Sequence, residues 1–372
     1  MIPDVQMMGL GICLFSIFLL LSREKKSAGD PISIAILSLW SLRFLLLYYK
    51  THLDLTQHSW VIVADQNLFF LDGVLLYWLT KSINGEPLTI WRRLLHLLPF
   101  LLAAYSSLSI YISLTNTDLV KLYEDLSEEL ATKTFEPHFW EWVFIVSLVV
   151  VNLIFLGLAI RKARQYNQAI LDQFSDVSKI KAPWLEPVLI ICMLFLVLPL
   201  VIYFTNYLRP TLDVGWLGKL LLFFFSLTAV LFSAYLVRQS FAPTPLVKTP
   251  EKRQISSEQT EKLQNLFRQL ETHMHTQRPY LEPALTLNKL AEQVELSANQ
   301  LSQVINTQTG GNFHDYINRF RIAEIKQALT ESDEQVIVLA YTHGFNSKST
   351  FNDVFKRFTG VTPTQYRKQG KT

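Results

Sequence analysis

The chain has 372 residues, of which half are hydrophobic and 17% are charged, and its formal net charge is +3. A soluble globular domain carries about 25% charged residues, so this composition argues against a single soluble domain, a disordered chain and a small disulfide scaffold. The charges are also unevenly distributed, with 37 charged residues in positions 1–250 and 28 in the much shorter stretch 251–372. We therefore expect an apolar front part followed by a soluble C-terminal part.

Seven apolar stretches follow one another in the front part, and each is long enough to cross a bilayer, which takes about 20 helical residues. Trp and Tyr cluster at their ends, as is typical of side chains at the level of the lipid headgroups. The first stretch lacks the positive charge and cleavage site of a signal peptide, so we expect it to be retained. The predicted spans are residues 5–22, 32–49, 61–80, 94–114, 139–160, 184–207 and 214–237. The pattern predicts a seven-helix transmembrane bundle, a sensor domain over residues 1–238; buried core helices are the alternative.

The loops between these spans differ in their content of Lys and Arg. Loops one, three and five together hold 11 such residues, and loops two, four and six hold four. Because positively charged loops stay in the cytoplasm, this asymmetry predicts an N-terminus outside the membrane and a cytoplasmic C-terminal domain. The two cysteines, Cys13 and Cys192, lie inside apolar runs without metal-ligand spacing. We expect buried thiols, with no disulfide, no metal site and no cofactor.

Ionisable residues inside membrane spans are costly and often functional. Arg43 and Asp65 lie at similar predicted depths, which suggests an ion pair, and Asp72 follows Asp65 two helical turns later. Glu141 lies in a Trp-Glu-Trp run near the outer interface. Two interpretations are open: an outward-facing pocket that binds a small signal molecule, or a buried pair that fixes helix packing. The acidic external loop 115–138 is either a site for a cationic ligand or a solvated amphipathic helix.

Three prolines, Pro243, Pro245 and Pro250, break the helical pattern after the last apolar stretch. They predict an extended linker over residues 239–257, because proline cannot continue a helix. A helix with one apolar stripe is predicted to begin near Glu258. We expect this stripe to pack on the C-terminal domain of residues 258–372, and a dimer-forming helix is the alternative.

Short helices in a repeated pattern are predicted for this C-terminal domain. Two of them are joined by a turn at Glu295-Leu296, and the second is capped by Ser297 and ends at Gly310. A longer helix follows, and the two-helix pattern then recurs around a turn at residues 343–345. Each pair is typical of a helix-turn-helix, in which the second helix enters the major groove of DNA. From residue 335 onward, six Lys or Arg accompany one acidic residue, which favours contact with phosphate.

The tandem arrangement carries a set of specific motifs. They are Leu287-x-x-Leu-Ala291, Ser297-x-x-x-Leu301-Ser302, Gly311-Asn-Phe313-x-x-Tyr316-Ile-Asn-x-x-Arg321, Ala340-x-x-x-Gly344-Phe345, Ser347-x-x-x-Phe351, Phe355-Lys356, Gly360-Val-Thr-Pro363 and Tyr366-Arg367. With these motifs, the stretch 285–368 closely resembles the DNA-binding domain of the AraC/XylS family of bacterial transcription regulators. The front part looks like that of the family's membrane-anchored members, in which a multi-helix membrane sensor replaces a soluble one.

The resemblance implies that two recognition helices, held apart by the long helix, enter successive segments of the major groove. Carried over by motif position, the base-reading residues would be Asn299, Ser302, Gln303, Lys348, Ser349, Asn352 and Asp353. Lys356 and Arg357 would hold backbone phosphate. Two positions depart from the usual pattern: Asp353 stands where a basic residue is common, and Ile325 stands where Ala is usual.

These features together predict an all-α, membrane-bound one-component transcription regulator of the bacterial inner membrane. The expected partners are double-stranded promoter DNA, the lipid bilayer, RNA polymerase, an unidentified small-molecule or peptide signal, and a second copy of the chain. A membrane transporter or enzyme with a regulatory DNA-binding tail is the alternative. We find no motif for a nucleophile and base and no internal repeat, so we expect no enzymatic activity. Release of the tail by proteolysis near residues 240–257 is a third interpretation.

Overall fold

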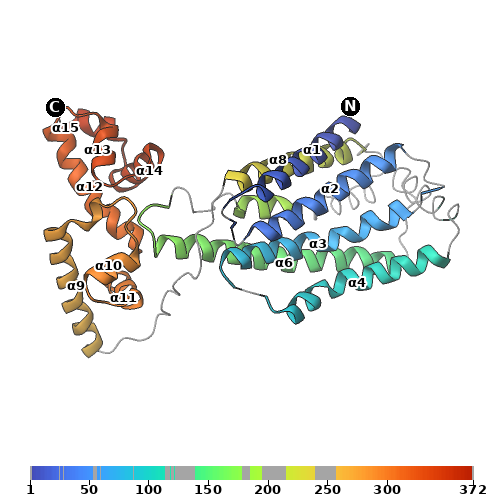
Figure 1. The fold of residues 1–372 in the computed structure, drawn as a ribbon, viewed down its shortest axis with the longest axis horizontal. Coiled ribbons are helices and arrows are strands. Elements are labelled where there is room, and N and C mark those ends of the chain that lie inside the picture. The colour runs from blue at the N-terminus through green and yellow to red at the C-terminus, as the bar shows by residue number, and fades with distance from the viewer. Residues whose placement is uncertain are drawn as a thin grey trace. The chain divides into compact units, whose positions relative to one another are not determined.

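The computed structural model describes residues 2–24, 26–27, 29–52, 57–58, 60–86, 88–113, 118, 121, 139–177, 185–194, 215–238 and 257–370. Within these ranges the named elements are all helices, and one isolated antiparallel bridge joins Phe174 to Thr286. The chain divides into two compact units (Figure 1). The first unit comprises residues 1–164 and 182–244, and the second comprises residues 165–181 and 245–372.

Long apolar helices build the first unit. Its consecutive helices pack as neighbours, α1 on α2, α2 on α3 and α3 on α4, while α8 packs on α1 and α2 (Figure 1). Their bounds are α1 Ile2–Leu21, α2 Asp30–His52, α3 Trp60–Ile83, α4 Ile90–Ser113, α6 Phe139–Leu171 and α8 Gly215–Arg238, with a further apolar helix at Leu185–Leu194. Helix α6 meets α3 where Asn152 bonds the backbone of Gly73 at 2.9 Å and that of Phe69 at 3.1 Å. A side chain at Gly73 would collide with Asn152, so glycine permits this approach.

Two of the described helices, Asp30–Lys50 and Val143–Leu171, are long and apolar enough to cross a membrane. Gln6–Leu21, Leu185–Leu194 and Phe223–Leu236 are apolar but shorter in the described part of the chain. The seven-span arrangement therefore stays a prediction. Much of the predicted sixth span (184–207), most of the acidic loop 115–138 and nearly all of the linker 239–257 lie outside the described residues.

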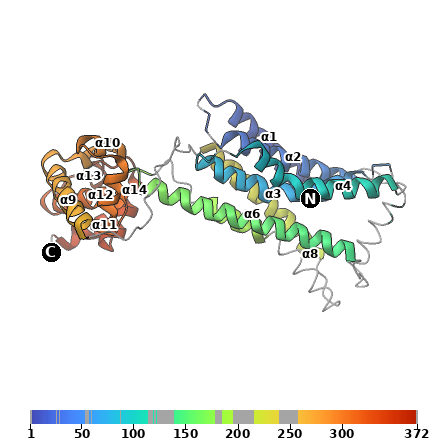
Figure 2. The ribbon, with the colours of Figure 1, turned by 90° about the horizontal axis from the view of Figure 1, so that it is seen from below.

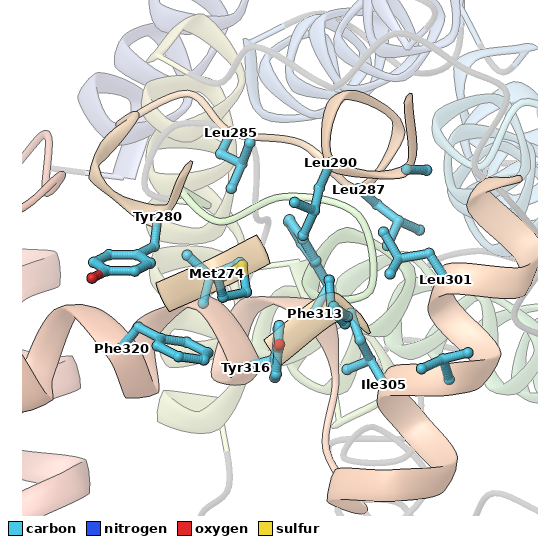
Figure 3. Close-up of a cluster of buried hydrophobic side chains, with 14 of the residues drawn as sticks. Met274, Tyr280, Leu285, Leu287, Leu290, Leu301, Ile305, Phe313, Tyr316 and Phe320 are labelled. Atoms are coloured by element: carbon cyan, nitrogen blue, oxygen red, sulfur yellow. The ribbon is translucent and has the colours of Figure 1, made fainter. Parts of the chain in front are cut away.

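The second unit is a set of shorter helices around two hydrophobic clusters. Its helices are α9 Ser257–Gln277, η1 Pro279–Leu281, α10 Leu287–Gln293, α11 Ala298–Thr309, α12 Phe313–Glu331, α13 Val336–Thr342, α14 Lys348–Thr359 and α15 Pro363–Gly370. The first cluster joins α9, α10, α11 and the first half of α12, with Met274, Leu290, Ile305 and Phe313 among its members (Figure 3). The second cluster joins the second half of α12 to α13 and α14. Helix α12 thus belongs to both cores and links them.

The apolar stripe of α9 packs inside the first cluster. Leu263, Leu270 and Met274 are buried there, and Tyr316 of α12 donates a hydrogen bond to Glu271 at 3.0 Å. The prediction that this helix packs on the C-terminal domain is confirmed.

Helix α6 is longer than the sequence pattern indicated. It continues as one helix to Leu171, eleven residues beyond the predicted end at residue 160 (Figure 2). The added turns keep a helical spacing of buried side chains, with Ala163, Tyr166 and Ile170 all covered. The last turns of α6 and the segment that follows belong to the second unit, so this unit is assembled from two separate parts of the chain.

Candidate nucleic-acid interface

The first helix-turn-helix consists of α10 and α11. Thr286 caps α10 by accepting a hydrogen bond from the backbone N–H of Lys289 at 3.3 Å. The turn places Glu295 at a φ of 54° and is closed by a bond from the Leu296 N–H to the Ala291 carbonyl at 2.9 Å. Ser297 and Gln300 then form a reciprocal capping box at the start of α11.

The second helix-turn-helix, α13 and α14, repeats this local structure. Its turn is closed by the bond from the Phe345 N–H to the Ala340 carbonyl at 3.0 Å, and Ser347 caps α14. Gly344 adopts a φ of 87° at the turn, the counterpart of Glu295. A Cβ atom on Gly344 would lie 2.7 Å from the carbonyl oxygen of Tyr280, so this turn requires glycine for space as well as conformation.

The outer face of α11 presents fewer of the predicted residues than expected. Asn299 is exposed and Gln303 is half-buried, so both reach the surface. Ser302 is only 4% exposed and accepts a hydrogen bond from Asn306 at 3.4 Å. It lies one residue from Leu301, at the edge of the buried face, and is not brought to the surface with the other two. Helix α11 carries no charged residue, so its outer face offers amides rather than ions.

Helix α14 presents the remaining predicted residues around its exposed side. Lys348, Ser349, Asp353, Lys356 and Arg357 are exposed and Asn352 is half-buried, while Phe351, Val354 and Phe355 face the core. Arg357 forms an ion pair of 2.5 Å with Asp315 in the first turn of α12. This contact fixes Arg357 beside α12, so a phosphate would have to share it or displace Asp315.

Helix α12 carries a buried arginine that the motif contained but to which the sequence assigned no role. Arg321 is 1% exposed; its Nε donates to the Tyr280 carbonyl at 2.7 Å, and its Nη2 donates to the Glu282 carbonyl at 2.8 Å. Its guanidinium also lies 5.6 Å from the ring centre of Phe345. Burial lowers the pKa of Arg321 to about 10, and nearby Asp176 opposes that shift. Arg321 therefore connects the loop before α10 to the turn of the second helix-turn-helix.

His314, the second residue of α12, is another buried ionisable group. It is 3% exposed, and its Nε2 lies 3.1 Å from the Nδ2 of Asn318. Burial is the main cause that lowers the pKa of His314 to about 4, so the ring is neutral at physiological pH. Three buried polar side chains, those of His314, Asn318 and Arg321, thus lie on the helix that links the two helix-turn-helix units.

The predicted sensing residues lie in the first unit and pair differently from the expectation. Arg43 bonds Asp72 at 2.6 Å, and Lys50 bonds Asp65 at 2.8 Å. The predicted pair of Arg43 with Asp65 is therefore wrong. Arg43 and Lys50 are seven residues apart on α2, and Asp65 and Asp72 are seven residues apart on α3. Because the two helices run antiparallel, Arg43 lies opposite Asp72 and Lys50 lies opposite Asp65. Glu141 lies in α6, but its side chain is outside the described part of the structure.

The Arg43–Asp72 pair is closely surrounded by aromatic rings. The indole Nε1 of Trp40 donates to Asp72 at 3.1 Å, and the guanidinium of Arg43 lies 3.6 Å from the ring centre of Phe69 and 4.9 Å from that of Phe225. Rings from α2, α3 and α8 therefore enclose the pair. Both interpretations of these charges, signal binding and helix packing, stay open.

Two helix-turn-helix units on one linking helix define a DNA-binding module. A model of the family described as "Helix-turn-helix domain" matches residues 290–369. The multiple antibiotic resistance protein MarA of Salmonella typhimurium is 36% identical over 87 residues, which cover 23% of this chain and 68% of MarA. The melibiose operon regulatory protein of Escherichia coli K12 is 34% identical over 87 residues, which cover 23% of this chain and 29% of that protein. The chain belongs to the AraC family of helix-turn-helix proteins.

The family model lies in the C-terminal part of the chain. The chain spans less than a third of the length of the melibiose operon regulator. A protein of Listeria innocua matches 27% of this chain over 94% of its own length, with 26% identity and a TM-score of 0.25. The C-terminal domain of the response regulator yesN from Fusobacterium nucleatum matches 30% of this chain over 99% of its own length, with 29% identity and a TM-score of 0.24.

Proposed function

We propose that the protein is a membrane-bound one-component transcription regulator, in which the first unit senses a signal in the inner membrane and the second binds promoter DNA. The observation that carries the membrane part is the distribution of side chains in the first unit. Large apolar residues are exposed, including Phe18 of α1 at 62% and Trp91 of α4 at 78%. Polar residues such as Ser33, Thr80 and Asn152 are buried. Water disfavours such a surface, whereas lipid favours it.

The charge asymmetry of the loops supports the proposed orientation. In this proposal the N-terminus lies outside the membrane and the second unit lies in the cytoplasm, where promoter DNA is available. A fluorescent protein fused after Thr372 should fluoresce in cells, and the protein should remain in the membrane fraction after an alkaline carbonate wash. Release into the soluble fraction would contradict the membrane proposal.

The proposed DNA contacts follow from the exposed faces of α11 and α14. Asn299 and Gln303 offer amides that can donate to and accept from base edges, and Lys348 stands at the exposed start of α14. Ser349, Asn352 and Asp353 complete the proposed base-reading surface, and Lys356 is proposed to hold phosphate. Ser302 is left out because it is buried.

Gel-shift titration tests these contacts with the full chain in lipid nanodiscs and the DNA that it occupies in cells. Gln303→Ala and Lys348→Ala should each weaken specific binding by about 1–3 kcal/mol, which is about 5- to 150-fold. Lys356→Ala should weaken binding to all sequences alike and reduce the salt dependence. Lys262→Ala is the matched control, because this exposed lysine lies on α9, outside both helix-turn-helix units. Wild-type affinity in both the Gln303 and Lys348 variants would refute the assignment.

The signal, RNA polymerase and a second copy of the chain complete the proposal. A signal acting on the first unit would change the placement or pairing of the DNA-binding units, and pairing raises their effective concentration at a repeated operator. The buried charges between α2 and α3 are the proposed sensing element, because charged groups at such depth are rarely retained without a role. A reporter gene under the mapped promoter would respond differently in an Asp72→Asn strain if this element senses the signal.

A further inference from the structure

A short segment far from the helix-turn-helix sequence is built into the second unit. Residues 173–176 follow the end of α6 by two positions and run antiparallel to the chain that leads into α10. The N–H of Leu287 donates to the Gln173 carbonyl at 2.9 Å, and the N–H of Ser175 donates to the Leu285 carbonyl at 3.2 Å. These bonds flank Thr286, the residue that caps α10, so the segment contacts the start of the first helix-turn-helix.

Ser175 is the centre of this contact and is 1% exposed. Its hydroxyl donates to the Leu285 carbonyl at 2.7 Å and accepts from Nη2 of Arg321 at 3.3 Å, while its carbonyl lies 2.9 Å from Nδ1 of His314. His314 and Arg321 are seven residues apart on α12, so both point to one face of that helix. The neutral ring of His314 satisfies both neighbours when Nδ1 donates to Ser175 and Nε2 accepts from Asn318. Ser175 is thus held by two buried polar side chains of the linking helix, His314 and Arg321.

The segment also contacts the second helix-turn-helix. Asp176 accepts a hydrogen bond from Nδ2 of Asn346 at 2.7 Å. Asn346 directly precedes Ser347, the residue that caps α14. One segment of four residues therefore contacts the cap of α10, the buried face of α12 and the turn before α14.

These three elements determine where the two recognition helices stand relative to each other. The two hydrophobic clusters of the unit are separate and share only α12, so few other contacts restrict the rotation of one helix-turn-helix against the other. The hydrogen bonds of residues 173–176 reach both helix-turn-helix units and therefore restrict this rotation. The same segment continues directly from α6, so a displacement of the end of α6 would act on it through the chain.

We propose that residues 173–176 are a positioning element that sets the spacing of α11 and α14 on DNA and makes this spacing dependent on α6. Ser175 and Asp176 are its positioning residues, and their partners are His314, Arg321 and Asn346. The inference rests on the proposed DNA-binding function. According to this inference, the segment after α6 takes part in DNA recognition although it lies outside the helix-turn-helix sequence.

The test compares full-length variants in nanodiscs on three DNA duplexes: the operator mapped in cells, the same operator with two base pairs inserted between its two contacted segments, and a duplex with one segment only. Asp176→Ala and Ser175→Ala should lower affinity for the intact operator about tenfold and reduce the preference for its native spacing. Affinity for the single segment should stay within twofold, because each helix-turn-helix remains folded. Glu334→Ala, which removes an exposed carboxylate elsewhere in the unit, is the control and should change none of these values.

Asn346→Ala should reproduce the effect of Asp176→Ala, and the double variant should lose no more than either single one. Hydrogen exchange of α11 and α14 should be unchanged in every variant, which separates positioning from loss of folding. Wild-type affinity and wild-type spacing preference in both the Asp176 and Ser175 variants would overturn the inference. Failure of the wild-type chain to bind any mapped duplex would instead contradict the proposed DNA-binding function.

Discussion

His314 should make the second unit lose stability as the pH falls from about 6.5 to about 4. In the folded unit its buried ring donates to the Ser175 carbonyl and accepts from Asn318, so a second proton would have no acceptor. Burial is the largest cause that lowers the pKa of His314 to about 4; Arg357 and Arg321 lower it further, while Asp315 and the bond to Ser175 oppose the shift. An unfolded chain carries a histidine of ordinary pKa, about 6.5.

The sign and size of the effect follow from these two pKa values. Below pH 6.5 the unfolded chain binds a proton that the folded unit excludes, so the free energy of unfolding falls with pH; the contribution is fully present above pH 6.5 and is lost by about pH 4. Between pH 7 and pH 5 the loss is about 2 kcal/mol, and the complete shift corresponds to about 3 kcal/mol.

Hydrogen exchange of α12 peptides in the full chain, followed from pH 7 to pH 5, measures this effect. All eight tryptophans lie in the first 216 residues, so tryptophan fluorescence would report on the first unit instead. His314→Asn keeps an amide donor near Ser175 but cannot titrate in this range. In α12 peptides that do not include residue 314, both chains share the same intrinsic exchange chemistry at each pH, so the ratio of their rates gives the difference in stability between them.

The wild type should be the more stable chain at pH 7, because the variant loses the acceptor for Asn318. This advantage should shrink by about 2 kcal/mol at pH 5, which is about a 30-fold change in the ratio of exchange rates. Thr307→Ala, at an exposed residue of α11 that does not titrate, should run parallel to the wild type across the same range. A constant difference between wild type and His314→Asn from pH 7 to pH 5 would refute the reasoning.

Three further predictions follow from particular contacts. Gly344→Ala should destabilise the second helix-turn-helix by more than about 2 kcal/mol, because it adds left-handed strain and a collision with the Tyr280 carbonyl. Gly310→Ala, at a φ of +67° but with open space around it, should cost only about 1 kcal/mol. Equal changes of the amide hydrogen exchange rates in the two variants would contradict the collision. Asp72→Asn should lower the fluorescence-detected melting temperature of the first unit by leaving Arg43 buried without its counter-charge, and the double variant with Arg43→Gln should recover part of the loss; no recovery would argue against the pair. Ser302→Ala should leave DNA affinity within twofold in the gel shift while Asn299→Ala lowers it, and the reverse order would show that α11 faces DNA differently.

Local signals made the helix-turn-helix units predictable from the sequence. Ser297 caps α11 and Gly310 ends it, as their sequence positions predicted, and Ser347 and Gly360 do the same for α14. Each of these contacts spans only a few residues, so the information lies within one short window. The burial of Ser302 was not predictable in the same way, because a serine at the edge of the apolar stripe can be either buried or exposed.

Contacts between distant parts of the chain left weaker signals. The bond of Asp176 to Asn346 joins residues 170 positions apart, and the segment that makes it is too short to show a periodicity. The pairing of Arg43 was within reach of the sequence, because equal spacing on two antiparallel helices requires Lys50 as the partner of Asp65. The apolar pattern hides this register, because Lys50 lies just beyond the predicted end of its span, among the loop residues.

Burying the charged guanidinium of Arg321 costs free energy, and the contacts of this side chain show what it connects. Among the described residues, the hydrogen-bond acceptors of this side chain are two backbone carbonyls and the Ser175 hydroxyl, and a well-packed apolar residue would avoid the desolvation of the charge. An apolar residue, however, would leave the Tyr280 and Glu282 carbonyls without these donors and would sever the loop before α10 from the segment after α6. A guanidinium has several donors in one fixed plane, so it can hold three chain segments at once. Arg321 is therefore better explained as the joint between the two helix-turn-helix units than as a source of stability, and its neighbours in that joint are the residues whose loss should change operator spacing before it changes folding.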